Sequence, residues 1–255
     1  MSERHRYLDE GRTRMDRLTM RRMVVVVAAA ALLAGCAATP SREAPSADDP
    51  WEPMNRVSYR VHEVVDGQII RPFVQAYVDY TPRLVQQGIH NFFGNIDDLF
   101  SFVNAALQNK PEKAGHDLGR FITNTGFGLL GIIDIASDAG VPKGEEDFGQ
   151  TFGVWGIPQG PYLFIPVFGP TTVRDGSGWV IRAYTTPIGY ISDVPLRNVL
   201  IGIGAVDLRA SALQAESLVN QAAIDRYTFI RRAYLQRRRY LVYDGQPPPL
   251  KEDDE

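Results

Sequence analysis

Residues 57–78, VSYRVHEVVDGQIIRPFVQAYV, place apolar side chains three and four positions apart over most of the stretch. Because an α-helix turns once every 3.6 residues, this spacing gathers those side chains on one face and predicts amphipathic helices. The pattern stops before Pro82, which is expected to end the second helix. One stripe consists of Val57, Val61, Val64 and Val65, and the next consists of Ile69, Ile70, Phe73, Val74, Tyr77 and Val78.

Helices are also predicted in the following 50 or so residues. Asn95, followed by Asp97 and Asp98, is typical of a helix N-terminus and predicts a new start there. Pro111 marks another predicted start. No stretch of this half alternates with period two for long, so the predicted fold class is all-α. The stripe before Asn95 consists of Val85, Ile89, Phe92 and Phe93, and Gly94 is expected to close it.

The second half is predicted to hold two further helices and a short apolar segment. Phe127 to Ile135 is apolar but too short to cross a bilayer, so a buried or interfacial helix is expected. Thr172, with Asp175 three residues later, has the spacing of a capped helix start. A long terminal helix is expected to carry an apolar stripe of Val219, Ala223, Tyr227, Ile230 and Tyr234, with Arg226, Arg231, Arg237, Arg238 and Arg239 elsewhere on its surface.

Phe148 to Pro170 differs in composition from the helical segments. Its 23 residues include six aromatic residues, five Gly and four Pro. Gly and Pro at this density disfavour regular structure, so this segment is predicted to be an irregular loop. So apolar a loop is expected either to fold over a core or to insert among lipid tails.

The N-terminal segment has the features of an export signal. An 11-residue apolar run, Val24 to Ala34, follows Arg21 and Arg22 and ends in Leu33-Ala34-Gly35-Cys36. It is too short to span a membrane, and Leu-Ala-Gly-Cys resembles the lipobox at which bacterial lipoproteins are cut and acylated. Cys36 is therefore the predicted lipid attachment point; an ordinary signal peptide with a chance cysteine is the alternative.

Four regions follow from this interpretation. They are a signal peptide at 1–35, a flexible tether at 36–48, a helical domain at 49–240 and a disordered acidic tail at 241–255. The translation start is left open among Met1, Met15, Met20 and Met23. The tether is rich in Ala, Ser, Pro and acids, and Ala37 rather than Asp follows the cysteine, which favours the outer membrane over the inner one.

Charge and cysteine content exclude several function classes. Without the first 35 residues the chain holds 20 Lys and Arg against 26 Asp and Glu, a net charge of about −6. Nucleic-acid binding is disfavoured, because neutralising phosphates requires a basic surface. Cys36 is the only cysteine, so once it is acylated disulfides, thiol nucleophiles and thiolate metal sites are excluded.

No group of residues predicts catalysis, a metal or a cofactor. Gly126-Phe127-Gly128-Leu129-Leu130-Gly131 spells the dinucleotide fingerprint but lacks the preceding strand, so its glycines are interpreted as allowing close packing or bending. His62, His90 and His116 stand alone without zinc-site spacing. Gly176-Ser177-Gly178 lacks the spacing of a nucleophile elbow. Glu145-Glu146-Asp147 is interpreted as a solvated turn, with a hard cation as the alternative.

Several motifs together resemble the VacJ (MlaA) family of outer-membrane lipoproteins. The longest is Asp49-Pro50-Trp51-Glu52-Pro53-Met54-Asn55-Arg56, and the resemblance extends to about Tyr240. The other motifs are Arg71-Pro72, Asn91-Phe92-Phe93-Gly94-Asn95, Gly160-Pro161-Tyr162 with Pro166, Gly169, Arg174 and Asp175, and Arg232-Ala233-Tyr234-Leu235-Gln236-Arg237.

The resemblance implies a fold and a function. The fold is a ring-like assembly of amphipathic helices embedded in the inner leaflet of the outer membrane, with the Gly/Pro/aromatic loop near a central channel. The function is removal of misplaced phospholipids from the outer leaflet and their delivery to a periplasmic lipid-carrier protein, which preserves lipid asymmetry. A trimeric porin is a further expected partner. The residues expected at the channel and loop are Phe148, Gly149, Phe152, Gly153, Trp155, Gly156, Gly160, Pro161, Tyr162, Pro166, Gly169, Arg174 and Asp175.

Three questions stay open at this point. Arg174 and Asp175 are interpreted as a structural pair, with contact to lipid headgroups as the alternative. Gly149, Gly153 and Gly156 are expected to make the loop mobile. A lipoprotein phospholipase and a passive scaffold between the membrane and a porin or the cell wall are the alternative functions.

Overall fold

A computed structural model describes residues 49–222 and 225–249. Cys36, the signal peptide and the tether lie outside these residues, as do the last six residues of the predicted tail. The first two residues of that tail, Leu241 and Val242, end the last helix rather than belonging to a disordered segment. In the part of the chain that is described, no helix is both long enough and apolar enough to cross a membrane.

The first predicted stripes form one nearly continuous helical arm. Helix α2 (Glu52–Val65) runs into the π-helical turn η2 (Asp66–Ile70), which runs into α3 (Arg71–Tyr80). A π turn adds a residue to the helical repeat and shifts which face points inward. The two apolar stripes are therefore joined without a loop.

Helix α4 (Arg83–Leu107) crosses the position where a break was predicted. The predicted end at Gly94 and new start at Asn95 are wrong, because both residues lie in the middle of this 25-residue helix and are buried. The end of the Lys143 side chain lies beside Gly94, with Nζ 2.5 Å from the position that a Cβ would take. Helix α5 (Pro111–Gly126) begins at the predicted proline and packs along α4.

The apolar segment after α5 is a turn rather than a helix. Its backbone is folded tightly, with positive φ at Leu129, Leu130 and Gly131, before the short helix α6 (Ile135–Asp138). The expected buried or interfacial helix is therefore wrong. The glycines of the dinucleotide-like string allow close approach here, because a Cβ on Gly131 would lie 2.4 Å from Asn95 Cβ.

The C-terminal half begins with helix α7 (Phe148–Val154) and a two-stranded antiparallel hairpin, β1 (Tyr162–Ile165) and β2 (Gly169–Thr172), in which Tyr162 pairs with Thr172. Helix α8 (Val173–Thr185) follows, and the Thr172 side chain accepts a hydrogen bond from the Asp175 N–H, which confirms the predicted cap. The remaining elements are η3 (Pro187–Tyr190), α9 (Val194–Ala222) and α10 (Arg226–Val242).

The predicted single terminal helix is two helices. Asp225 caps the start of α10 by accepting a hydrogen bond from the Thr228 N–H, so the chain restarts there in a new direction. Ala223 of the predicted stripe lies outside the described residues, and Val219 lies where side chains are not described. Two of the arginines predicted on the surface, Arg231 and Arg238, are buried.

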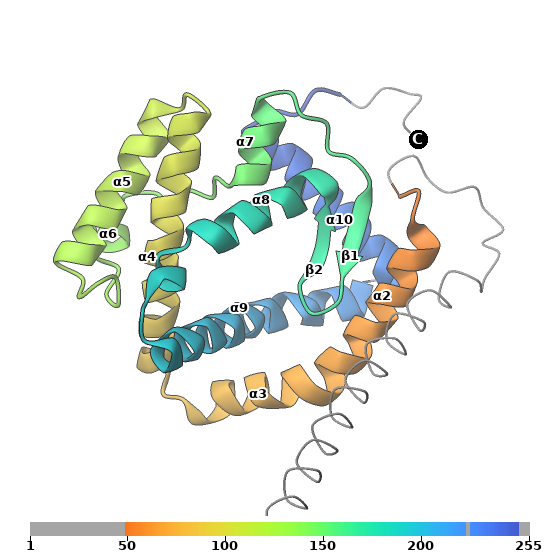
Figure 1. Cartoon of the computed structure of the whole chain (residues 1–255), viewed down its shortest axis with the longest axis horizontal. Helices are drawn as coiled ribbons and strands as arrows, with labels where there is room; N and C mark the ends of the chain where they lie inside the picture. Colours follow the sequence, from red (N-terminus) through yellow and green to blue (C-terminus); the bar gives the residue numbers. More distant parts are fainter. Residues whose placement is uncertain (1–48, 223–224, 250–255) are drawn as a thin grey trace, which may run out of the picture.

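The elements are arranged as a ring, as Figure 1 shows. Helices α4, α8 and α9 and the β1–β2 hairpin surround an opening in the ribbon, and the α2–η2–α3 arm runs outside α9. The fold is mostly helical, as the sequence predicts, and the hairpin is a small β element that the all-α prediction did not include.

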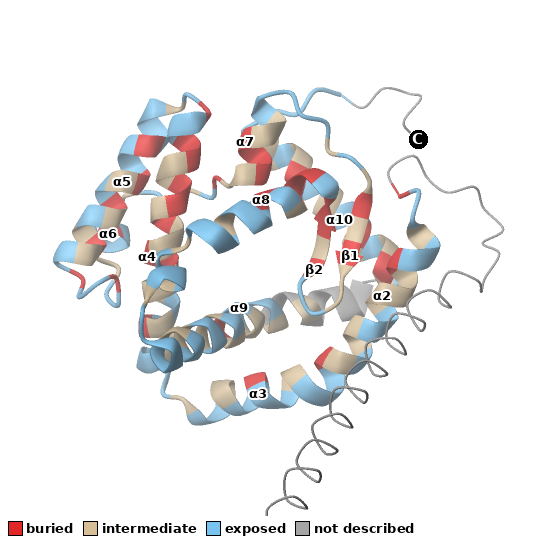
Figure 2. Cartoon of the chain, in the orientation of Figure 1, coloured by how far each residue is buried: buried red, intermediate tan, exposed pale blue. Residues whose placement is uncertain are grey.

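The polarity of the molecule is inverted relative to an ordinary globular domain. Among the described residues, 21 polar or charged residues are buried against eight hydrophobic ones, while 35 large hydrophobic residues are exposed. Figure 2 shows that the buried positions form short patches where elements meet, and that long stretches of the helices are exposed. Apolar area this extensive marks a surface that contacts something other than water.

Candidate functional site

The segment 148–170 holds most of the predicted site residues, and it is largely regular rather than an irregular loop. The Asp147 side chain caps α7 by accepting a hydrogen bond from the Gln150 N–H. The strands pair in antiparallel register, which satisfies the backbone groups that face the partner strand. Phe148, Gly149, Phe152 and Gly153 lie in α7; Trp155 and Gly156 follow it; Gly160 and Pro161 precede β1; Tyr162 is in β1; Pro166 is in the hairpin turn; Gly169 opens β2; Arg174 and Asp175 open α8.

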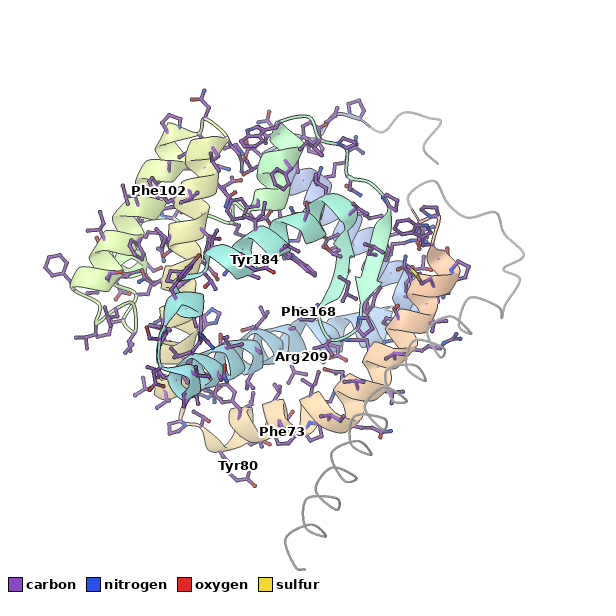
Figure 3. The ribbon with its side chains drawn as sticks, in the orientation of Figure 1. Phe73, Tyr80, Phe102, Phe168, Tyr184 and Arg209 are labelled. Atoms are coloured by element: carbon purple, nitrogen blue, oxygen red, sulfur yellow. The ribbon has the colours of Figure 1, made fainter. Side chains whose placement is uncertain are left out.

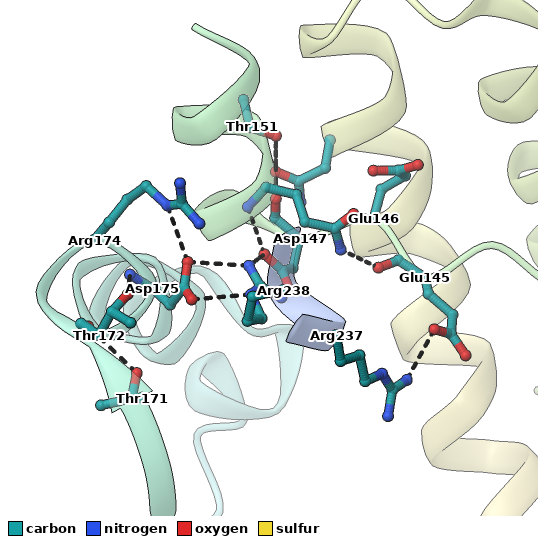
Figure 4. Close-up of polar contacts among 12 residues, drawn as sticks. Glu145, Glu146, Asp147, Thr151, Thr171, Thr172, Arg174, Asp175, Arg237 and Arg238 are labelled. Carbon is teal, nitrogen blue, oxygen red and sulfur yellow. Dashed lines mark hydrogen bonds and ion pairs between the residues drawn. The ribbon is translucent and has the colours of Figure 1, made fainter. Parts of the chain in front are cut away.

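A buried ion cluster joins α7, α8 and α10 (Figure 4). The Arg238 guanidinium donates to Asp147 Oδ1 at 2.9 Å and to Asp175 Oδ1 at 3.1 Å. Tyr234 Oη donates to Asp175 Oδ2 at 2.8 Å, and Arg174 Nε donates to Asp175 Oδ1 at 3.1 Å. Burial alone would raise the pKa of Asp147, but Arg238 and the Gln150 N–H hold it below its usual value.

The geometry of Arg174 and Asp175 is that of a structural pair. Both residues are buried, and Asp175 is shared among Arg174, Tyr234 and Arg238. Because an unpaired buried carboxylate is strongly unfavourable, this sharing fixes α8 against α7 and α10.

Two glycines of α7 make close packing possible rather than mobility. A Cβ on Gly149 would lie 2.5 Å from Asp175 Oδ1, and one on Gly153 would lie 2.9 Å from Arg174 Nη1. The two glycines are four residues apart and therefore on the same face of α7, which lets this helix lie directly on the ion cluster. Gly156 differs, since its φ of 86° is the left-handed conformation that glycine adopts freely at the end of the helix.

Replacing Gly149 by Ala is therefore expected to lower the free energy of unfolding by about 1–3 kcal/mol, because the added methyl group collides with Asp175. Gly67→Ala is the matched control, since nothing lies within 4 Å of a Cβ at that helical position, and it is expected to leave stability unchanged or raise it. Denaturant unfolding of the purified variants measures both. Equal effects at the two positions would contradict this role for Gly149.

The acidic run before α7 is also an ion-pairing element. Glu146 is buried and accepts from Lys113 Nζ at 2.7 Å, and Asp147 pairs with Arg238. Glu145 alone is exposed, where it pairs with Arg237. The solvated-turn interpretation is therefore wrong for Glu146, because two lysines, Lys110 and Lys113, neutralise it in the interior.

A second buried cluster explains the motif Asp49 to Arg56. Asp49 accepts from Asn55 Nδ2 at 2.8 Å and from Arg231 Nη1 at 2.8 Å, and it also accepts from Tyr227 Oη. Asn55 in turn donates to the Tyr162 carbonyl at 3.0 Å. This cluster joins α2, the hairpin and α10. The sequence shows Asp49 and Asn55 only as parts of a motif, because their other buried partners lie more than 100 positions away in the chain and leave no local signal.

The opening in the ring is bordered by exposed apolar side chains and a charged cluster. Tyr184 on α8, Phe168 at the hairpin turn and Arg209 on α9 lie around it (Figure 3), and Tyr184 and Phe168 are 77% and 74% exposed. Arg209 pairs with Asp66 at 2.6 Å and with Glu216 at 2.7 Å. The border therefore combines apolar side chains with fixed charges, a combination that can accommodate an amphipathic ligand. Phe168 belongs to the segment 148–170 that is predicted near the channel but is not singled out there, and Tyr184 is not among the predicted site residues.

Comparison with known proteins connects this architecture to a family. The family model described as MlaA lipoprotein matches residues 47–241. The chain belongs to the MlaA lipoprotein family. Within this family it is 32% identical over 225 residues to the "Intermembrane phospholipid transport system lipoprotein MlaA" of Haemophilus influenzae, covering 86% of this chain and 90% of that one. The Escherichia coli K12 protein with the same description is 32% identical over 223 residues, covering 86% of this chain and 87% of its own.

A solved structure supports the same membership. It is described as "Structural basis for maintenance of bacterial outer membrane lipid asymmetry" and superposes with a TM-score of 0.67 at 31% identity, covering 76% of this chain and 98% of its own. The family match predicted from the motifs is thus confirmed, as is the mostly helical fold. In this MlaA-family chain the motif residues Asp49, Asn55, Arg174 and Asp175 all belong to the two buried clusters.

Proposed function

We propose that this protein is the outer-membrane lipoprotein of an intermembrane phospholipid transport system. In this proposal it removes misplaced phospholipids from the outer leaflet through the opening of its ring and passes them to a periplasmic lipid carrier. The observation that carries the proposal is the combination of family membership with a ring whose charges are paired inside and whose large apolar side chains are exposed.

The physical chemistry of lipids favours such a conduit. Each CH₂ group of an acyl chain costs about 0.8 kcal/mol to expose to water, so a two-tailed lipid cannot cross an aqueous gap unaided at a useful rate. A ring bordered by Tyr184 and Phe168 offers apolar contact for the tails, while the Arg209 cluster offers polar contact for a headgroup. The ring itself is a passive component, and the direction of transfer is set elsewhere in the system.

The membrane placement is part of the proposal. The exposed apolar turn after α5 includes Phe127, Leu129 and Leu130, and α2, α3 and α9 expose further apolar residues, which suits a domain embedded in the periplasmic leaflet of the outer membrane. Acylation of Cys36 adds anchoring and directs sorting. A trimeric porin is a further proposed neighbour in the same membrane.

The predicted site residues divide into two roles under this proposal. We propose that Trp155, which is exposed, and Pro166, which lies in the hairpin turn, contact lipid. The buried members, such as Gly149, Tyr162 and Asp175, position the hairpin and α8. The protein acts as a transport component, and the described residues contain no group of three or more His, Cys, Asp or Glu able to hold a metal.

The test is to purify the full chain from membranes and identify co-purifying lipid by mass spectrometry, alongside a variant of the opening. Phe168→Glu places a charge on an exposed side chain at the border, and Tyr243→Glu, at the exposed C-cap of α10, is the control. Phe168→Glu is expected to retain less than about half of the bound phospholipid, because a carboxylate loses its hydration when acyl chains pack against it. In cells it is expected to raise outer-leaflet phospholipid several-fold.

Other outcomes identify the alternatives. Released fatty acid or lysolipid would identify a phospholipase. A Phe168→Glu protein that is folded, anchored and fully functional would favour the passive scaffold. Lipid-free wild-type protein, with an unchanged outer leaflet in the deletion strain, would overturn the proposal.

A further inference from the structure

The β1–β2 hairpin lies along one face of α2 and is held there at three levels. Asn55, Tyr59 and His62 are spaced four and three residues apart, so they share a face of the helix. Asn55 contacts the base of the hairpin, and the Tyr59 ring packs edge-on against Phe164 at 5.2 Å between ring centroids. His62 contacts the turn, because its Nδ1 accepts a hydrogen bond from the Val167 N–H at 3.1 Å.

The two ends of this contact differ in chemistry. At the base, Asn55 is fully buried and both donates to the Tyr162 carbonyl and accepts from the Phe164 N–H at 2.9 Å. An amide does not titrate, so this end is independent of pH. At the turn, one hydrogen bond connects 166–168 to another element within residues 49–222 and 225–249. It runs from the Val167 N–H to the imidazole of His62. An imidazole nitrogen accepts a hydrogen bond only while it is unprotonated.

The turn itself is held in an unfavourable backbone conformation. Val167 has a φ of 72°, a left-handed value that a β-branched residue adopts only at a cost. The adjacent Phe168 is 74% exposed and lies at the border of the ring opening. The turn is strained and exposed, and one side-chain hydrogen bond holds it to α2. It is therefore the part of the hairpin that can change position when that hydrogen bond is lost.

We propose that His62 is a proton-dependent positioning residue that holds the hairpin turn at the border of the opening while its imidazole is neutral and releases it when the imidazole is protonated. The base stays attached through Asn55, so the movement is confined to the turn. Its consequence for lipid passage rests on the function proposed above, whereas the movement itself does not.

The surroundings of His62 set the direction of the pH dependence. Burial lowers its pKa below the ordinary 6.5; the Asp66 carboxylate opposes this shift, Arg209 on α9 adds to it, and the carboxylates of Glu63 and Glu216 also oppose it. We call the turn closed when the hydrogen bond between Val167 and His62 is formed. A histidine whose pKa is lower in the closed state than in the open state stabilises the closed state at pH values above its ordinary pKa. The closed turn is therefore stable at neutral and higher pH and is lost as the pH falls below about 6.5, by up to about tenfold in the closed-to-open ratio per pH unit.

Hydrogen–deuterium exchange of the hairpin peptide tests this in the full-length protein, reconstituted in phosphatidylethanolamine and phosphatidylglycerol vesicles. Variants are compared with the wild type at the same pH, so intrinsic exchange rates cancel. His62→Asn keeps an acceptor oxygen near the Nδ1 position but does not titrate, and His62→Leu removes the acceptor. His90→Asn is the control, because His90 also faces a carboxylate, Asp207, but contacts no part of the hairpin turn.

At about pH 7.5, wild type and His62→Asn are expected to protect the Val167 amide equally, and His62→Leu to protect it severalfold less. At about pH 5, wild type and His90→Asn are expected to lose about tenfold in protection while His62→Asn keeps it. Wild-type protection that is the same at both pH values, or a loss that persists in His62→Asn, would overturn the proposal. If the pH effect is seen here but the protein purifies from membranes without phospholipid and the deletion strain has an unchanged outer leaflet, the transport function is overturned and the role of His62 stands.

Discussion

Replacing Arg238 by Met is expected to lower the free energy of unfolding by about 3–5 kcal/mol, because it leaves the buried Asp175 carboxylate without its bridging cation and removes the partner of the partly exposed Asp147. Arg238 is buried and bridges Asp147 and Asp175, which belong to different helices. Met preserves the volume of the aliphatic stem, so the loss reports on the charge. Denaturant unfolding of the protein in detergent micelles gives the measurement.

The adjacent arginine provides the control for Arg238. Arg237 pairs with Glu145 at 2.9 Å, but their side chains are 68% and 59% exposed. Exposed ion pairs contribute about 0–1 kcal/mol, so Arg237→Met is expected to be nearly neutral. Adding Asp147→Asn to Arg238→Met should recover part of the loss, and a double variant no more stable than the single one would argue against the ion cluster as the cause.

Replacing Arg120 by Met is expected to have an effect of similar size, about 3–5 kcal/mol at neutral pH, in the α4–α5 pair. Arg120 is 1% exposed and donates to Asp98 Oδ2 at 3.1 Å, to Asp134 Oδ2 at 2.9 Å and to the Val141 carbonyl at 2.8 Å. It therefore ties α4 and the turn before α6 to α5. Arg83→Met, at an exposed position in the first turn of α4, is expected to change stability by less than about 0.5 kcal/mol.

The effect of Arg120→Met should depend on pH in a defined direction. Burial raises the pKa of Asp98 to about 6, against the opposing influence of Lys143 and Arg120. Without Arg120 the carboxyl takes up a proton more readily, and a protonated Asp98 no longer needs a cation. The destabilisation is therefore expected to be smaller at about pH 5 than at about pH 8 when unfolding is measured at both. An effect independent of pH would show that Asp98 ionisation does not contribute.

Local features of the sequence predicted a large part of the helical framework. The spacing of Val57 to Val78 predicted the α2–α3 arm, Pro111 predicted the start of α5, and Thr172 with Asp175 predicted the start of α8. These signals depend on residues a few positions apart, whose geometry in a helix is fixed by the backbone. The family resemblance also rests on local signals, because each of its motifs is a short contiguous run of residues, and the match to the family model confirms it.

Predictions failed where a local signal was overridden by packing. The predicted helix end at Gly94 is wrong because Gly94 lies within α4, where the Lys143 ammonium group comes close to the helix. The composition of 148–170 predicts an irregular loop, yet Gly149 and Gly153 let α7 lie on the ion cluster, and strand pairing orders 162–165 and the residues from 169 on. In both places glycine has a role in close approach, which composition alone does not distinguish from flexibility.

The sequence by itself determined the helical class, several helix starts and membership of the MlaA lipoprotein family. Only the tertiary structure decided which polar residues are buried, which apolar residues are exposed and which charges pair. Asp49 and Arg231 are 182 positions apart, and Asp147 and Arg238 are 91 apart. Periodicity reports on neighbours within a helical turn, whereas the partner of a buried charge is set by how distant elements pack, and no local pattern encodes that choice.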